Sequence, residues 1–519
     1  MVKHGPRRAL PVGAALMSLL CAGAVIGQPK QVGAQTVPVR AAVDAAGRSP
    51  ALAPGGPIRH VVVIYMENHS FDSLLGYWCD DNPGRCPVGG MPPSVRLSNG
   101  VDVTPSTASD VVPNVRHTTG DQQTAIDGGR MDGWWRVPGC SGAARYRCIS
   151  GYQPGQVPNL ARLASDFAIS DATFSMQDSP SWFGHEYAVA ATTDGFTGSN
   201  PGPAKNVPPQ QGWGCDSDQA AQWWDGRQLQ QVPSCVPDPA LTYRGAPLPN
   251  GGAFERTPVP YVPTIMDRLN AAGLPWRLYG ALCTTEITRP SGLEECTNTP
   301  QSLSYGWAIC PTFAELLYTG QCNGLNVAGD GSTSDAQFIT DANSGRLPAF
   351  SVVTPGSDGD SEHNGFSMTR GDNWLGQLAS AVMNGPEWDS TAVFITWDDC
   401  GCFYDQVRPG TNPDGTPQGP RVPMVIVSPW VRSGYTDSTH TTFAGVLAFA
   451  EATFGLQSLG ANDAGATTSG ARSTSASGRC PPSACATARS PRATTSGGPR
   501  PGRTRERGYV RPNPAATPG

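Results

Sequence analysis

The chain has 519 residues, with 62 glycines, 50 prolines and only 15% charged residues. This composition fits a loop-rich globular protein and argues against a coiled coil or disorder throughout. The formal net charge is −6, but residues 465–519 carry nine arginines against one glutamate, and residues 1–34 carry four basic residues and no acid. The acidic body between these ends is poorly suited to nucleic acids, and it suits a site in which carboxylates surround a cation.

The N-terminus has the pattern of an export signal. Basic residues, including the pair Arg7-Arg8, precede an apolar stretch from about Ala9 to Ile26 that is followed by small residues. We predict a signal peptide over 1–34 and a linker over 35–55. Export could follow either the general secretory route or the twin-arginine route. A lipoprotein anchor at Cys21 is a weaker alternative, because its neighbours fit that motif poorly. No later apolar run could span a bilayer, so we expect a secreted or cell-envelope protein.

Four apolar, β-branched runs predict buried strands. Their apolarity is nearly continuous instead of alternating, as in a parallel sheet covered on both faces. Helical patterns lie between them, and this alternation indicates an α/β fold with a doubly wound sheet. The predicted strands are His60–Tyr65, Ala349–Thr354, Thr391–Thr396 and Val422–Ser428. The predicted helices are Pro263–Ala272, Trp374–Asn384, Thr441–Thr453 and a further one over residues 183–191.

Two segments differ from this pattern. Residues of about 199–345 are rich in Gly, Pro, Trp and Cys, and we interpret them as a loop-rich, disulfide-pinned insertion with a few core segments, within a main domain over 56–460. Residues 461–519 are rich in Arg, Ser, Thr and Pro and nearly lack large apolar side chains, so we expect them to be disordered.

Twelve cysteines between the export signal and the tail fall into couples that are close in sequence. An even count in an exported chain predicts disulfides that pin surface loops. A zinc site is the alternative, but no paired C-x2-C with suitably spaced histidines is present. The couples are Cys79/Cys86, Cys140/Cys148, Cys215/Cys235, Cys283/Cys296, Cys310/Cys322 and Cys400/Cys402.

Polar residues directly follow three of the predicted strands. Glu67-Asn68 follows the first, Asp398-Asp399 follows the third, and the second runs into Asp358, Asp360, Glu362 and His363. Ligands bind at the carboxyl ends of strands in a parallel α/β sheet, and so much buried negative charge needs a cation. Each group alone is commonly a turn or a helix cap; their agreement across strands favours a metal site.

Ser181 is a candidate nucleophile. It precedes the predicted helix over 183–191, and the N-terminus of a helix favours anions such as phosphate. A serine there also caps helices for structural reasons alone, but a nearby metal can activate its hydroxyl. The sequence has no H-E-x-x-H, no G-x-S-x-G and no P-loop, and Lys205 is its only lysine after the leader.

The segment from Ile58 to Asp72 resembles the opening motif of the bacterial phosphoesterase family that contains phospholipase C and related acid phosphatases, within the alkaline-phosphatase superfamily. Further matching segments follow in the expected order, and the resemblance covers about residues 56–460. They are Asp127–Trp134, Phe167–Asp171, Ser361–His363, Trp397–Asp399, Phe403–Asp405, Arg421–Pro423 and Val427–Trp430.

The resemblance implies an alkaline-phosphatase-like three-layer α/β/α sandwich and a divalent metal, which could be zinc, calcium, manganese or magnesium. The implied metal ligands are Glu67, Asn68, Asp398, Asp399 and the nucleophile Ser181. It further implies that His117 and His363 bind the phosphoryl oxygens or protonate the leaving group. Ser181 would attack phosphorus, a histidine would protonate the departing alkoxide, and water would release a phosphoseryl intermediate.

The chain departs from the family pattern at three places. Phe183-Gly184-His185 replaces the usual Pro-Asn-Arg or Pro-Asn-His, so the residues that would contact phosphate or substrate differ, His185 among them. Gln406 stands where the family usually has a histidine. The family pattern stops near Ala464, and we suspect that the end of the chain is frame-shifted or truncated. His440 is a weaker candidate for the site.

We expect a secreted, monomeric phosphoric-ester hydrolase acting on a small phosphate ester in the manner of an acid phosphatase. Phospholipase C action on phospholipid head groups, with transient contact to a membrane surface, is the alternative. It would need an apolar rim, which the tryptophans of the insertion could supply or bury in a core. A non-catalytic binding protein with a relic site and another enzyme of the superfamily, such as a sulfatase, are less favoured. The tryptophans are Trp213, Trp223, Trp224 and Trp307.

Overall fold

The computed structural model of the chain describes residues 56–203, 213–240 without 216 and 218, 257–280, 309–322, 334–355 and 358–467, together with short strands within 242–247, 286–296 and 327–328. The predicted signal peptide, the linker up to residue 55 and the chain after Thr467 lie outside these residues. No helix in the described part of the chain is long and apolar enough to cross a membrane.

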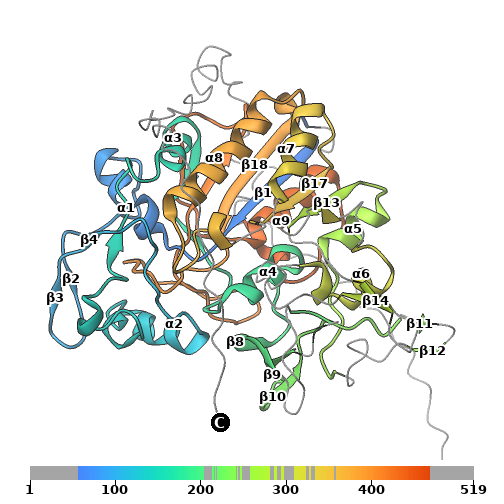
Figure 1. Cartoon of the computed structure of the whole chain (residues 1–519), viewed down its shortest axis with the longest axis horizontal. Coiled ribbons are helices and arrows are strands. Elements are labelled where there is room, and N and C mark those ends of the chain that lie inside the picture. The colour runs from blue at the N-terminus through green and yellow to red at the C-terminus, as the bar shows by residue number, and fades with distance from the viewer. Residues whose placement is uncertain are drawn as a thin grey trace, which may run out of the picture. The chain divides into compact units, whose positions relative to one another are not determined.

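A sheet of eight strands forms the centre of the fold (Figure 1). All four predicted strands belong to it, and the central pair β1 and β18 are parallel neighbours along their whole length. In spatial order the strands are β16 (Val327–Ala328), β13 (Trp276–Tyr279), β17 (Phe350–Val353), β1 (His60–Met66), β18 (Thr391–Trp397), β19 (Met424–Val427), β6 (Ala168–Ser170) and β20 (Thr436–Asp437).

The sheet is mostly parallel, as expected, with one exception. β19 is antiparallel to both of its neighbours, which departs from the parallel strand predicted from its apolar run. A buried antiparallel strand is as apolar as a parallel one, so periodicity does not reveal its direction. No strand or helix intervenes between β18 and β19, and a return without a crossover suits antiparallel pairing.

Both faces of the sheet are covered. Every residue of β18 is buried, and on one face the rings of Tyr65 and Phe394 contact Phe443 and Phe449, which belong to α9 and the residue before it. Helices α4, α5 and α9 pack together, and α3 and α7 pack against α8 across the other face (Figure 1). This layering agrees with the predicted three-layer sandwich; its likeness to alkaline phosphatase remains a prediction.

The predicted helices are confirmed, with shifted ends. The helix expected from Trp374 starts six residues earlier, because Ser367 caps it by accepting a hydrogen bond from Arg370 N. The helices are α1 (Phe71–Asp81), α2 (Thr119–Ile126), α3 (Pro158–Asp166), α4 (Ser181–Ala190), α5 (Ile265–Ala271), α6 (Ala314–Tyr318), α7 (Ser334–Ser344), α8 (Met368–Asn384) and α9 (Ala444–Phe454).

The region of 199–345 contributes to the core as well as to loops. It supplies β13 and β16 of the central sheet, and it contains most of a second, antiparallel sheet. That sheet meets α4 where Trp182 N donates to Asn200 Oδ1 at 3.0 Å, so it lies next to Ser181. Its strands are β8 (Phe196–Pro203), β9 (Gln219–Trp224) and β10 (Leu229–Pro233).

Four of the predicted disulfides are confirmed and one is wrong. The bonded pairs are Cys79–Cys86, Cys140–Cys148, Cys215–Cys235 and Cys310–Cys322. Cys400 and Cys402 are buried free thiols on a turn at Gly401. A bond between cysteines separated by one residue would have to distort this turn. Cys283 of the sixth couple lies outside the described residues.

Arg421 ties together three segments at the end of the sheet. Its fully buried guanidinium donates to Asp72 Oδ1 at 2.8 Å and to Asp405 Oδ1 at 2.9 Å. It also donates to the carbonyls of Gly89 and Asp171 and lies 4.5 Å from the centre of the Phe71 ring. A buried charge of this kind is tolerated because its donors all have partners. The start of α1 and the loop between β18 and β19 are thereby held together.

Replacing Arg421 with Met is expected to destabilise the fold strongly. Removing one partner of a buried ion pair costs about 3–5 kcal/mol, because the remaining charges stay buried. The matched control is Arg96→Met, since the Arg96–Asp102 pair is about 65% and 60% exposed and such pairs contribute at most about 1 kcal/mol. Denaturant unfolding followed by tryptophan fluorescence measures both variants. Equal unfolding midpoints for the two would contradict this account.

Candidate active site

The carboxylates after β1 and β18 meet at the end of the sheet. Met66 and Trp397 are partners in the parallel register, so Glu67 and Asp398 follow as neighbours. Asp398 N donates to Met66 O at 3.0 Å, and Asn68 N donates to Asp398 Oδ1 at 2.9 Å. The side chains after both strands are buried. The predicted pairing of these two segments is thus found.

Burial and mutual repulsion dominate the electrostatics of this group. Loss of solvation raises the pKa of Asp398 well above its ordinary value, and the charge of Glu67 adds to that effect. The pKa of Asp399 is raised in the same way, first by burial and then by the charge of Asp398. Without a compensating positive charge, burial therefore favours the protonated forms of these groups.

Helix α4 brings Ser181 and His185 to the same group. They are four residues apart and so share one face of the helix. Ser181 Oγ donates to Asn68 Oδ1 at 3.2 Å, and His185 Nε2 lies 2.8 Å from Glu67 Oε1. The helix can approach this closely because residue 184 is glycine: a Cβ there would lie 3.0 Å from both the Cβ and the carbonyl oxygen of Asp398.

Asn68 occupies the centre of the site in a left-handed conformation, with φ of 60°. Its side-chain oxygen faces Ser181 Oγ and the Asp399 carboxylate. With the amide turned over, its nitrogen would donate to Asp399 Oδ2 and Oδ1 at 3.0 and 3.1 Å, and its oxygen would accept from His363 Nε2 at 2.9 Å. The two orientations differ in which end of the amide faces the Asp399 carboxylate, and a cation beside Asp399 would favour the one that directs the oxygen toward it.

Two of the three histidines predicted to contact phosphate, His117 and His363, lie together beside Asn68, whereas His185 lies beside Glu67. The rings of His117 and His363 are 5.9 Å apart between centroids. Burial, followed by the charge of His117, lowers the pKa of His363 to about 4, and burial also lowers the pKa of His117. The loop that carries His363 is fixed because Glu67 N donates to Ser361 O at 3.1 Å.

Not every residue after β17 joins the group. Asp360 instead forms an ion pair with Arg370 at 2.6 Å, and Glu362 Oε2 accepts from the Trp397 indole at 3.0 Å. The side chain of Asp358 lies outside the described residues. His440 stacks on the ring of Phe174 and contacts Gln418. Among the described side chains that follow β17, His363 therefore joins the group, while Asp360 and Glu362 have other partners.

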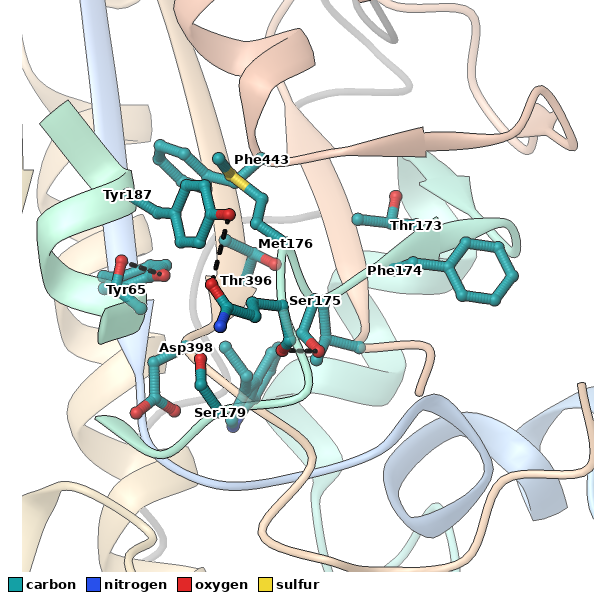
Figure 2. A pocket seen from close by; sticks show the side chains of 14 residues that line it. Tyr65, Thr173, Phe174, Ser175, Met176, Ser179, Tyr187, Thr396, Asp398 and Phe443 are labelled. Atoms are coloured by element: carbon teal, nitrogen blue, oxygen red, sulfur yellow. Dashed lines mark hydrogen bonds between the residues drawn. The ribbon is translucent and has the colours of Figure 1, made fainter. Parts of the chain in front are cut away.

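A small cavity lies beside Asp398, lined by polar groups of the loop before α4 and by aromatic and other apolar side chains (Figure 2). Its volume is about 10 Å³, enough for one water molecule and too little for a phosphate ester. Substrate therefore has to approach the carboxylates from another side. Residues whose side chains Figure 2 places around the cavity include Tyr65, Ser175, Ser179, Tyr187 and Thr396.

The group fits a divalent cation. Asp398 Oδ2 is buried and accepts no hydrogen bond from the described residues, and potential ligand atoms of Glu67, His185 and Asp398 lie within 4.8 Å of one another. Carboxylate, amide and imidazole donors all bind divalent metals in proteins. The position of His185 beside Glu67 was not predicted. His185 follows Ser181 by four residues at the start of a predicted helix, and this spacing could have indicated that the two side chains share one face.

Comparison with known proteins identifies the family to which the chain is similar. The sequence profile of the Phosphoesterase family matches residues 58–457. Non-specific phospholipase C6 of Arabidopsis thaliana is 23% identical over 78% of this chain and 69% of its own length. Phospholipase C A of Mycobacterium tuberculosis is 24% identical over 77% of this chain and 73% of its own. The non-hemolytic phospholipase C of Pseudomonas aeruginosa is 25% identical over 77% of this chain and 54% of its own length.

The match to the family profile covers well over half of the chain and includes each of the segments that meet at the carboxylates. The chain spans between 54 and 73% of the length of these three relatives. The chain therefore belongs to the Phosphoesterase family and is a hydrolase of phosphoric esters.

Proposed function

We propose that this hydrolase uses Ser181 as its nucleophile and a divalent cation held by the buried carboxylates. The main support is the position of Ser181, which is the first residue of a ten-residue helix. Its Oγ lies 3.2 Å from Asn68 Oδ1, inside the buried group that contains Glu67 and Asp398. The N-terminus of α4 would stabilise the negative charge of a phosphoryl group through the helix dipole.

Each residue has a distinct part in the proposed reaction. Ser181 Oγ attacks phosphorus and forms a phosphoseryl ester, while His117 and His363 contact the phosphoryl oxygens and supply a proton to the departing alkoxide. Water then hydrolyses the ester and restores Ser181. A bound divalent cation would offset the carboxylate charge and lower the pKa of the serine hydroxyl. Burial lowers the pKa of both histidines, and the negative charge of a bound phosphoryl group would raise it and favour the protonated form that donates to the leaving oxygen.

For the substrate we propose a phospholipid, in the manner of phospholipase C. The three relatives named above are all phospholipases C. One surface feature also favours this choice over a soluble monoester. Trp224 and Leu229 are 48% and 54% exposed and face each other across β9 and β10, at the sheet that meets α4. Tryptophan is enriched where proteins touch membrane interfaces. Trp223 is buried, and Trp307 lies outside the described residues.

Secretion through the predicted signal peptide and a monomeric state remain proposals. Four disulfides in the described part of the chain support an oxidising location.

Replacing Ser181 with Ala is expected to reduce turnover of bis-p-nitrophenyl phosphate by more than about 10³-fold, because the proposed nucleophile is lost. Substrate binding should change little. Ser150→Ala is the matched control, since Ser150 is equally buried but donates to Arg147 O. Release of p-nitrophenolate measures both. Retained turnover in the Ser181 variant would exclude the nucleophile assignment.

Removing divalent metal is expected to abolish turnover and lower the melting temperature, because Glu67, Asp398 and Asp399 then lose their counter-charge. A ligand present at about 100 times its Kd stabilises the folded state by about 2.7 kcal/mol. Dialysis against a chelator, followed by metal analysis, turnover assays and thermal unfolding, tests this, and adding metal back should restore both properties. Unchanged turnover in verified metal-free protein would contradict the proposal.

Replacing Trp224 and Leu229 together with Ser is expected to slow hydrolysis of phosphatidylcholine vesicles and to leave soluble bis-p-nitrophenyl phosphate unaffected. Burying one such side chain contributes about 1.5–3 kcal/mol, so vesicle binding should weaken by about tenfold or more. Val101→Ser and Val111→Ser, also exposed apolar positions, form the control pair. If the wild-type protein turns over p-nitrophenyl phosphate but no phosphatidylcholine, a phosphomonoesterase replaces the phospholipase.

A further inference from the structure

His185 stands inside the carboxylate group. Its side chain is about 2% exposed, and its Nε2 lies 2.8 Å from Glu67 Oε1. With Glu67 and Asp398 it forms the set whose potential ligand atoms all lie within 4.8 Å of one another. We propose that His185 is a direct metal ligand, so that the cation site is a mixed nitrogen–oxygen site that selects a transition metal such as zinc. The inference rests on the cation of the proposed function and specifies its class.

The distances between the potential ligand atoms are only slightly longer than those of an occupied zinc site. Zinc binds imidazole nitrogen at about 2.0–2.1 Å and carboxylate oxygen at about 2.0–2.2 Å, so two of its ligand atoms can be no more than about 4.4 Å apart. The observed limit of 4.8 Å requires only a small inward movement. Asp398 Oδ2, which accepts no hydrogen bond from the described residues, has a lone pair available for such an ion.

The helix fixes the imidazole where a ligand would have to be. Tyr65 OH donates to Gly184 O at 2.9 Å, and the Tyr65 ring meets the His185 ring edge-on at 5.2 Å between centroids. Gly184 lets the helix approach Asp398 without a side chain between them. Ser181 lies one turn earlier on the same face, so a single rigid element would carry both the nucleophile and the nitrogen ligand.

Ligand chemistry then narrows the metal. Calcium takes six to eight oxygen ligands, and magnesium prefers an octahedral oxygen shell with several waters. Imidazole nitrogen is instead typical of zinc, copper, nickel and iron sites. Of the four metals that the sequence left open, zinc agrees best with a neutral imidazole beside two carboxylates.

The test measures metal ligation and not turnover. Full-length protein is stripped with a chelator and reloaded with one equivalent of zinc, and X-ray absorption at the zinc edge reports imidazole ligation. Competition with a chromophoric chelator gives the zinc Kd. We expect imidazole scattering in the wild type and its loss in His185→Gln. The zinc Kd of that variant should rise more than about 100-fold, because loss of even an outer-shell partner costs about 10–100-fold.

His440→Gln is the matched control, because His440 contacts Gln418 and Phe174; its spectrum and zinc Kd should equal those of the wild type. Wild-type protein that binds zinc without imidazole scattering would overturn the inference, as would an unchanged zinc Kd in His185→Gln. If His185→Gln does not fold, His185→Asn takes its place, and loss of imidazole scattering relative to the wild type is again the expected result. Imidazole ligation together with an active Ser181→Ala variant would exclude Ser181 as the nucleophile but would still support His185 as a metal ligand.

Discussion

Glu67, Asp398 and Asp399 are buried within reach of one another's charge, where water cannot solvate them. Carboxylates in this position either take up protons or share a cation. The central pair of parallel strands imposes the arrangement, since their register ends with Met66 beside Trp397. Most other features around the site can be understood as ways of approaching this group or of surrounding it.

Close approach is achieved by the backbone. Asn68 adopts a left-handed conformation directly after β1, and Gly401 lies against it, with room for no Cβ because one would come within 2.4 Å of Asn68 O. Gly184 does the same for α4 against Asp398. Arg421 holds the loop that follows Asp399 by pairing with Asp405 and Asp72. The acidic group thus depends on tight turns and on a second, fully paired ionic cluster nearby.

Much of this arrangement could be predicted from the sequence. Continuous apolar runs identified β1, β17, β18 and β19, and the polar residues after β1 and β18 identified the two halves of the site. What could not be predicted depends on contacts across the chain. Asp360 forms an ion pair with Arg370 on α8 and so does not join the site. The thiols of Cys400 and Cys402 lie on a turn and form no disulfide. The ion pair between Arg421 and Asp72 joins residues 349 positions apart, which no local pattern reveals.

The contacts of His117 and His363 constrain their two ring nitrogens differently. His363 has Asn364 O 3.2 Å from Nδ1 and the Asn68 amide beside Nε2. A neutral imidazole carries a single N–H, so donating it to Asn364 leaves Nε2 to accept from the Asn68 amide, whose oxygen then points at Ser181. His117 engages Val115 O through Nδ1, and its Nε2 has no hydrogen-bond partner among the described residues. The carbonyl oxygen of Asn364 thereby sets the tautomer of His363 and the orientation of the Asn68 amide, whereas Nε2 of His117 stays open to a further partner.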